Sequence, residues 1–169
     1  SDANPVFKNV DPDKMKQALS KVPFVVSLSP WLDDSSRWAD MLIPDSHFLY
    51  SWDINSSHTL TGQPVVTVGR PCVPSADPES RSTADLIIEL GQSVCESTKE
   101  ALPFESSKDA VRAVCDALAA SGRGGPFGPE DDVGWTRLLE RSGWQRPAAG
   151  SADEFYNKVL ETGGWLDPI

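Results

Sequence analysis

The sequence is short of positive charge. Its 169 residues hold 15 lysines and arginines against 25 aspartates and glutamates, which gives a net charge of −10. The basic residues are scattered and form no cluster, so a surface that binds phosphate backbones is not expected. The same balance disfavours docking on anionic lipid. We therefore predict that nucleic acid is not a partner of this chain.

The sequence also lacks a long apolar run. No window approaches the ~18 apolar residues that a membrane-spanning helix requires, and we predict no direct membrane insertion. The N-terminus has no basic segment followed by an apolar one, so no signal peptide is expected. The sequence alone leaves the compartment unknown.

Catalytic and metal-binding patterns are missing as well. The sequence has no CxxC, GxSxG, GxGxxG or P-loop motif, and no cysteine stands near a histidine in the chain. We predict no catalytic residue and no metal site, and we interpret the cysteines as semi-buried structural thiols. The cysteines are Cys72, Cys95 and Cys115, and the two histidines are His47 and His58.

Asp45 and His47 are separated by one residue. In an extended segment the two side chains would lie on the same side, which would suit a catalytic or ligating role. The alternative is a loop histidine that is hydrogen-bonded to the backbone. Because this spacing is common in proteins, it does not distinguish a functional histidine from a structural one.

A compact strand–helix–strand pattern is present between Pro23 and Asp53. Pro23–Leu28 is an apolar run with little alternation, which is typical of a strand covered on both faces. Ser36–Asp40 then predicts a short helix, and Met41–Ile43 predicts a second strand that ends at Pro44. The pattern indicates a right-handed βαβ unit.

Further elements are predicted on both sides of this unit. Asp11 and Pro12 are a typical N-cap and first helical residue. The segment Ser46–Thr61 is polar and rich in turn-forming residues. The remaining predictions are a strand at Gln63–Gly69, a loop at Arg70–Ser80, and helices at Asp13–Ser20, Arg81–Val94, Ser106–Ala120, Asp131–Ser142 and Ala152–Glu161, the last ending at Gly163.

These elements predict an α/β fold, part of a doubly wound, mainly parallel, Rossmann-like sheet with a helical C-terminal extension. Residues 1–95 would form the α/β domain and residues 96–169 the extension, with a Gly/Pro linker near 121–130. Only three strands are readable, and a doubly wound sheet normally has five or six. We therefore interpret the chain as a piece of a larger polypeptide; a domain completed by oligomerisation is the alternative.

Several polar residues follow the predicted strands and would meet at one rim of a parallel sheet, where ligands of such sheets bind. Asp33 and Ser35, at the start of the short helix, could hold a polar group of a ligand or simply cap the helix. The candidate binding residues are Asn4, Pro5, Ser29, Asp33, Ser35, Pro44 and Asp45.

Several short motifs follow one another along the chain: Ala3-Asn4-Pro5, Val25-Val26, Asp33-Asp34-Ser35, Ala39-Asp40, Leu42-Ile43-Pro44, Gln63-Pro64-Val65-Val66, Arg81-Ser82-Thr83-Ala84-Asp85 and Gly163-Gly164-Trp165. In this order they resemble the third domain of the large subunits of the molybdopterin oxidoreductase family, in the branch that includes the polysulfide reductases. The resemblance covers nearly the whole chain. Each motif alone is weak, and their order makes the set specific.

The resemblance implies a fragment of a redox-enzyme large subunit that is inactive alone, because the family's iron–sulfur cysteine motif and metal ligand are absent. The loops after Asn4, Ser29 and Pro44 would approach the guanosine end of a bis-(molybdopterin guanine dinucleotide) cofactor, which could be present in the parent protein but is not expected to bind the fragment alone. The implied partners are the remaining domains of the parent chain and iron–sulfur and membrane quinone-binding subunits. The parent would be periplasmic or extracytoplasmic and membrane-associated.

Ser29 departs from the family pattern. Members that bind the cofactor usually carry at this position an Asp, which accepts hydrogen bonds from guanine. The sequence of residues 27–34 and 44–53 is closer to the molybdopterin-like subunits of quinone-oxidoreductase complexes such as alternative complex III, which are understood to lack the molybdenum cofactor. The site could therefore be vacant.

A second functional hypothesis is a non-catalytic structural or interaction α/β module that completes its sheet with a partner. The incomplete sheet motivates it, as do the six tryptophans, which are typical core or interface anchors.

Overall fold

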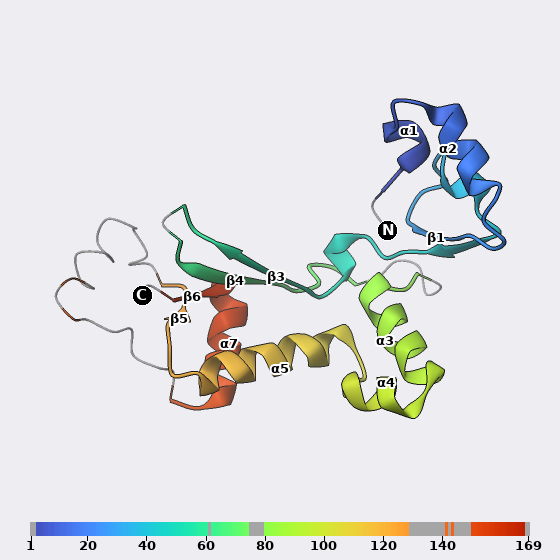
Figure 1. Ribbon diagram of the computed structural model, residues 1–169. Helices are drawn as coiled ribbons and strands as arrows, with labels where there is room; N and C mark the ends of the chain where they lie inside the picture. The colour runs from blue at the N-terminus through green and yellow to red at the C-terminus, as the bar shows by residue number, and fades with distance from the viewer. Residues whose placement is uncertain are drawn as a thin grey trace. The chain divides into compact units, whose positions relative to one another are not determined.

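The computed structural model describes residues 3–60, 62–74, 80–128, 141, 143 and 150–167 (Figure 1). The chain divides into two compact units. Unit 1 comprises Ser1–Ser51 and Cys72–Pro103, and unit 2 comprises Trp52–Pro71 and Phe104–Ile169. Within the described ranges, no helix is long and apolar enough to cross a bilayer.

Unit 1 begins with two short helices, α1 (Pro5–Lys8) and α2 (Pro12–Leu19). Each has a proline in its first turn, and each is capped by the preceding side chain: Asn4 accepts from the Phe7 amide and Asp11 from the Lys14 amide. Such caps satisfy amides that have no partner inside the helix. The helix start predicted at Asp11 and Pro12 is confirmed.

The predicted strand pair is also found in unit 1. β1 (Val26–Ser29) and β2 (Met41–Pro44) pair in parallel, from Val26 opposite Met41 to Ser29 opposite Pro44. The connection contains one 3-10 turn, η1 (Ser36–Trp38), where a short helix was predicted.

The second part of unit 1 is helical. After η2 (Phe48–Tyr50) come α3 (Thr83–Val94), capped by Ser82, and α4 (Glu96–Ala101). The helix predicted at 81–94 is thus confirmed, whereas α4 was not predicted. Asp45 and Arg81 form an isolated parallel bridge just beyond β2, which places the start of α3 at the carboxyl end of that strand.

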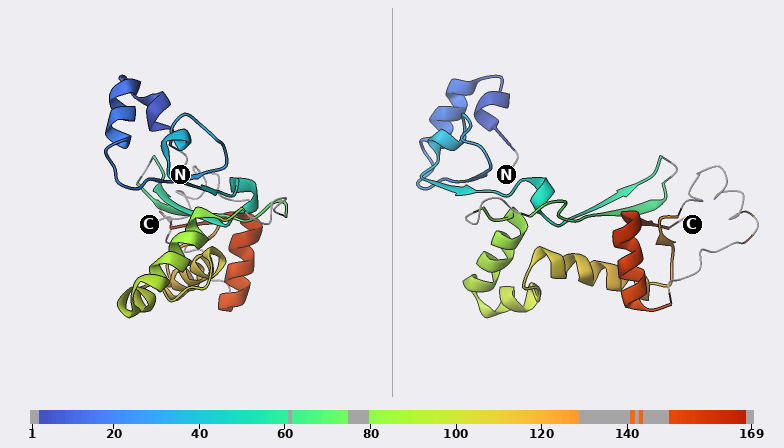
Figure 2. Two further views of the ribbon diagram at one scale, coloured as in Figure 1. Left: turned by 90° about the vertical axis from the view of Figure 1, so that its right-hand side faces the viewer. Right: turned by 180° about the vertical axis from the view of Figure 1, so that it is seen from behind.

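Unit 2 contains a four-stranded antiparallel sheet in the order β3-β4-β6-β5. In all views α5 and α7 lie on one side of this sheet (Figures 1 and 2). Both helices begin as predicted, with Ser106 and Ser151 as caps. The elements are β3 (Asp53–His58), β4 (Pro64–Gly69), α5 (Ser107–Ala120), β5 (Gly125–Pro126), α7 (Ala152–Thr162) and β6 (Gly164–Leu166).

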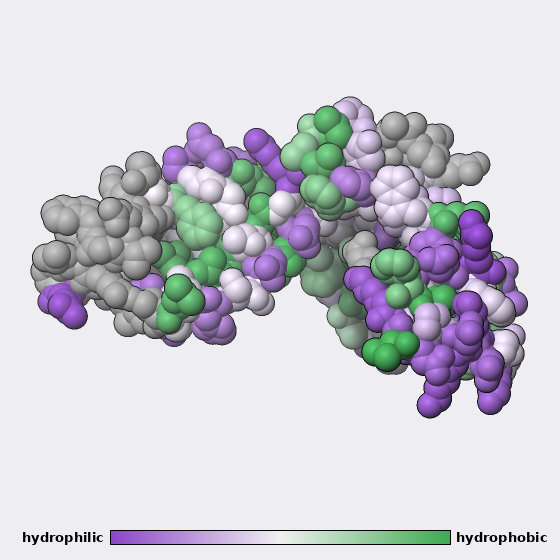
Figure 3. Space-filling model, turned by 90° about the horizontal axis from the view of Figure 1, so that it is seen from above, coloured by the Kyte–Doolittle hydropathy of each residue, from purple (hydrophilic) through white to green (hydrophobic). Residues whose placement is uncertain are grey.

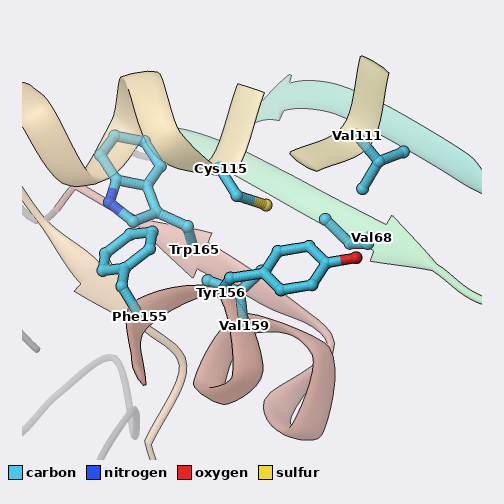
Figure 4. Packing of buried hydrophobic residues seen from close by; sticks show 7 residues of the cluster. All are labelled: Val68, Val111, Cys115, Phe155, Tyr156, Val159 and Trp165. Carbon is cyan, nitrogen blue, oxygen red and sulfur yellow. The ribbon is translucent and has the colours of Figure 1, made fainter. Parts of the chain in front are cut away.

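The hydrophobic core of unit 2 lies between the sheet and its two helices. Side chains from α5, α7, β4 and β6 converge there (Figure 4). The cluster consists of Val68, Val111, Cys115, Phe155, Tyr156, Val159 and Trp165. Burial of this apolar surface is the main stabilising contribution in unit 2.

The predicted doubly wound, mainly parallel, Rossmann-like sheet is wrong. The described strands form one parallel pair and a separate antiparallel sheet. The error arose at residues 46–61, because the polar sequence of β3 reads as a loop. A short connection follows β3, with the Thr59 amide donating to the Gln63 carbonyl at 2.8 Å, and so short a connection requires antiparallel pairing. Of the helix predicted at 131–142, only Arg141 lies within the described residues.

Two glycines of unit 2 offer a matched stability test. Gly163 has a φ of +85° and open space where a Cβ would lie, whereas Gly124 has a φ of +59° and a Cβ there would strike the Leu166 carbonyl oxygen and the Trp165 ring. Gly163→Ala should cost about 1–2 kcal/mol for the left-handed backbone alone. Gly124→Ala should cost about 1–3 kcal/mol more because of the steric overlap.

Urea unfolding of both variants measures the difference. Equal losses of stability would contradict the described packing of residue 124 against β6.

Candidate functional site

A groove of about 550 Å³ in unit 1 is the candidate functional site. Its walls come from α1, α2 and η1 together with the turn before η1. It is lined by Val6, Phe7, Pro12, Lys16, Asp34, Arg37 and Trp38. Val6 and Asp34 are adjacent in the chain to the predicted binding residues Pro5 and Asp33, but none of the predicted binding residues itself lines the groove.

Asn4 and Ser35 are brought together and hold two walls of the groove in place. The Ser35 hydroxyl donates to Asn4 Oδ1 at 2.7 Å and accepts from the Val6 amide at 2.9 Å. Asn4 Oδ1 also accepts from the Phe7 amide at 3.2 Å. These bonds tie α1 to the turn before η1, and they leave neither side chain lining the groove.

Asp33 caps the same turn. Its Oδ1 accepts from the Ser36 amide and from the Ser36 hydroxyl, both at 2.7 Å. The Ser36 hydroxyl and then the Ser36 amide hold the pKa of Asp33 below its usual value of 3.8, because both bonds favour the charged form. Ser36 is itself buried and lies 3.0 Å from the Ser27 hydroxyl of β1. Asp33 thus caps this turn, which is one of the two roles considered for it.

Ser29 and Asp45 are likewise used within the protein. The Ser29 hydroxyl donates to the Trp31 carbonyl at 2.7 Å and accepts from the Trp31 amide at 3.2 Å. Asp45 accepts from the Thr83 amide at 2.9 Å and from the Thr83 hydroxyl at 2.6 Å. The Asp45 carboxylate therefore lies at the first turn of α3, where its negative charge is favourable.

Pro5 and Pro44 have backbone roles. Pro5 is the first residue of α1, and the Pro44 carbonyl accepts from the Arg81 amide at 3.1 Å. Pro44 also stands opposite Ser29 in the β1–β2 register. The carboxyl ends of the two strands thus lie side by side, as the predicted rim requires.

The residues that line the groove were not predicted. Phe7 and Trp38 are 73% and 44% exposed, and nothing in their sequence pattern distinguishes an exposed aromatic from a core one. Their position beside the capping residues Asn4 and Ser35 was the available signal.

The charges around the groove are mixed. Lys16 pairs with Asp13 at 2.9 Å, an exposed pair that contributes little stability. Arg37 and Asp34 are exposed, and within the described ranges neither has an ion pair. The groove therefore offers one guanidinium, one ammonium and one carboxylate next to two aromatic rings.

The histidine and cysteine predictions have separate outcomes. His47 Nδ1 accepts from the Leu49 amide at 3.4 Å, so the backbone-bonded alternative is the observed one. Cys115 is buried, whereas Cys72 and Cys95 are exposed and not semi-buried as predicted. Hydrogen bonds from Ser97 and then Thr98 lower the pKa of Cys95 to about 7. No group of three potential metal ligands occurs among the described residues.

No family model, curated protein or solved structure matches this chain. The resemblance to the molybdopterin oxidoreductases therefore depends on the ordered motifs alone.

The Asp33 cap gives a pH-dependent prediction. Because the folded-state pKa of Asp33 is depressed, its stabilising contribution is present above the unfolded pKa and is lost as the pH falls through the folded value, below 3.8. Asp33→Ala should therefore cost about 1 kcal/mol at pH 6, and the cost should shrink below pH 3.8.

Urea unfolding at a series of pH values measures this cost, with the neighbouring exposed residue as control in Asp34→Ala. A cost that is independent of pH, or equal in the two variants, would contradict the cap.

Proposed function

We propose that this chain is part of a molybdopterin oxidoreductase-family large subunit in a respiratory redox complex, and that it contributes to assembly rather than to cofactor binding. The ordered motifs from Asn4 to Trp165 support the family. The parallel β1–β2 pair, with Ser29 and Pro44 at adjacent strand ends, is compatible with a rim of the expected kind.

The hydrogen bonds of the predicted binding residues support the part of the proposal that excludes cofactor binding. A guanosine site needs acceptors that face the ligand, and here Asp33 and Asp45 accept from the protein's own Ser36 and Thr83. Ser29, where the family has Asp, is bonded to Trp31. Because most of these acceptors are engaged within the protein, we infer that no pterin guanine dinucleotide binds here, and no redox step is assigned to these residues.

The burial pattern of unit 1 supports a role in assembly. Its buried apolar residues are Val6 and Ile88, whereas all the large exposed apolar side chains of the described chain except Leu60 and Val114 belong to unit 1. In Figure 3, exposed apolar residues (green) lie on the surface between polar ones (purple). Exposed apolar surface on this scale is typical of interfaces. We assign this surface to contacts with the remaining domains of the parent subunit, whose complex would also hold iron–sulfur and membrane quinone-binding subunits.

Isothermal titration with GMP tests the absence of a guanosine site. We expect no saturable heat up to millimolar GMP, because the Ser29 hydroxyl, Asp33 Oδ1 and both carboxylate oxygens of Asp45 are already bonded within the protein. Asn4→Ala and the remote control Asp53→Ala should leave this result unchanged. Saturable binding that Asn4→Ala weakens and Asp53→Ala does not would contradict the proposal, as would stoichiometric molybdenum or tungsten in the purified parent protein.

The second candidate is a separate interaction module that completes its sheet with a partner, and the free edge of β1 favours it. The carbonyls of Val25 and Ser29 accept from residues on the β2 side. Since alternate residues of a strand point to opposite edges, Val26 and Leu28 direct their backbone groups away from β2, and β1 has no other strand partner in the described ranges. An iron–sulfur cysteine motif encoded upstream in the same reading frame would favour the first candidate over this one.

A further inference from the structure

We propose that the outer edge of β3 pairs with β3 of a second copy of this chain, so that the antiparallel sheets of two copies join across a two-fold axis. This interaction surface goes beyond the proposed function and does not depend on the family to which the chain belongs. It uses residues of unit 2 alone and none of the exposed apolar side chains of unit 1.

The hydrogen bonds of β4 show which of its residues face β6. The Val68 amide donates to the Gly163 carbonyl at 3.0 Å, and the Pro64 carbonyl accepts from the Asp167 amide at 3.0 Å. Because alternate residues of an antiparallel strand bond toward opposite edges, the even-numbered residues of β4 bond toward β6 and the odd-numbered ones toward β3.

The register of the hairpin then identifies the free backbone groups of β3. Odd-numbered residues of β3 stand opposite odd-numbered residues of β4, and the bond from the Thr59 amide to the Gln63 carbonyl continues this pattern past the strand. The even-numbered residues therefore direct their amides and carbonyls away from β4. They are Ile54, Ser56 and His58, and β3 has no second strand partner in the part of the chain that is described.

The β3 edge lacks the features by which proteins usually prevent strand addition. Such edges are short, or carry lysine, proline or a bulge. β5, at the opposite edge of the sheet, consists of Gly125 and Pro126 alone. β3 has six residues, contains no lysine, arginine or proline, and pairs with β4 in a continuous register. It is therefore the edge of this sheet that can accept another strand.

Symmetry and charge favour a second copy as that strand. In an antiparallel pair centred on Ser56, Ile54 of each copy stands opposite His58 of the other, so all the outward backbone groups find partners. Asp53, the one carboxylate of β3, stands opposite Thr59 of the other copy. The pairing thus opposes no like charges, although the chain carries a net charge of −10.

Leu60 adds an apolar contact to the same arrangement. Its side chain is fully exposed, and it follows β3 by only two residues. In the register centred on Ser56, Leu60 of one copy comes beside Trp52 of the other, a half-buried residue that packs against the core of unit 2. The two-fold axis produces this contact twice, and such apolar anchors supply most of the binding energy of an interface.

Sedimentation velocity of the intact chain tests the proposal. We expect a weak monomer–dimer equilibrium between about 10 µM and about 1 mM, because the contact is small. Since two copies of net charge −10 repel each other, about 0.5 M NaCl should strengthen the dimer. The amides of Ile54, Ser56 and His58 should exchange with solvent more slowly at the higher protein concentration.

Variants identify the edge that is used. Ser56→Pro should weaken the dimer about tenfold or more, because it removes an outward amide and leaves the bonds to β4 in place. Ala152→Pro is the matched control, since position 152 is the first residue of α7, where proline is tolerated, and it should leave the dimer unchanged. Leu60→Asp should also weaken the dimer, and because Leu60 is fully exposed, this variant gives a reading even if Ser56→Pro does not fold.

Three results would overturn the proposal. They are sedimentation as a monomer over the whole concentration range, a dimer that Leu60→Asp and a folded Ser56→Pro both leave intact, and a dimer in which the outward amides of β3 exchange as fast as in the monomer. None of these results bears on GMP binding or on the metal content of the parent protein, so a failure here is distinguishable from a failure of the proposed function.

Discussion

Unit 2 has a buried hydrophobic core, whereas unit 1 buries few apolar side chains. The exposed surface and the hydrogen-bonded local order of unit 1 both follow from this difference. In unit 2, side chains from two strands and two helices face one another, with Val111, Cys115 and Val159 almost completely buried. In unit 1 the sheet has only two short strands, and Val26, Met41 and Leu42 remain 41–48% exposed. A two-stranded sheet is marginal on its own, and parallel strands are normally covered on both faces. This arrangement supports the proposal that further domains or a partner cover unit 1.

Hydrogen bonds give unit 1 the local order that a core would otherwise provide. Ser35 joins α1 to the turn before η1, Asp33 caps that turn, and Asp45 holds the start of α3. The polar residues that resemble a ligand-binding rim are thus used as structural links. The same links position Phe7 and Trp38 around the groove.

The local elements could be predicted from the sequence where a specific residue determines them. Asp11 with Pro12, and the serines that precede α3, α5 and α7, start helices for reasons that act over four residues. The parallel β1–β2 pair could be predicted because both strands are short apolar runs bounded by turn-forming residues.

The sheet of unit 2 could not be predicted in the same way. β3 is polar because it lies at an edge, and β5 and β6 are very short and begin with glycine. β6 pairs with β4 and β5 pairs with β6, so these pairings depend on contacts between residues far apart in the chain and not on local pattern. The groove escaped prediction for a similar reason, since the exposure of Trp38 depends on neighbours distant in the sequence.

Amide hydrogen exchange of the isolated chain tests most directly whether unit 1 lacks a core of its own. Global stability protects amides in a packed core, whereas amides in a poorly covered element exchange through local opening. We expect the amides of β4, α5 and α7 to exchange at least a hundredfold more slowly than those of β1 and β2. Protection of β1 and β2 equal to that of β4 would contradict the account, because it would mean that unit 1 is stable without any further cover.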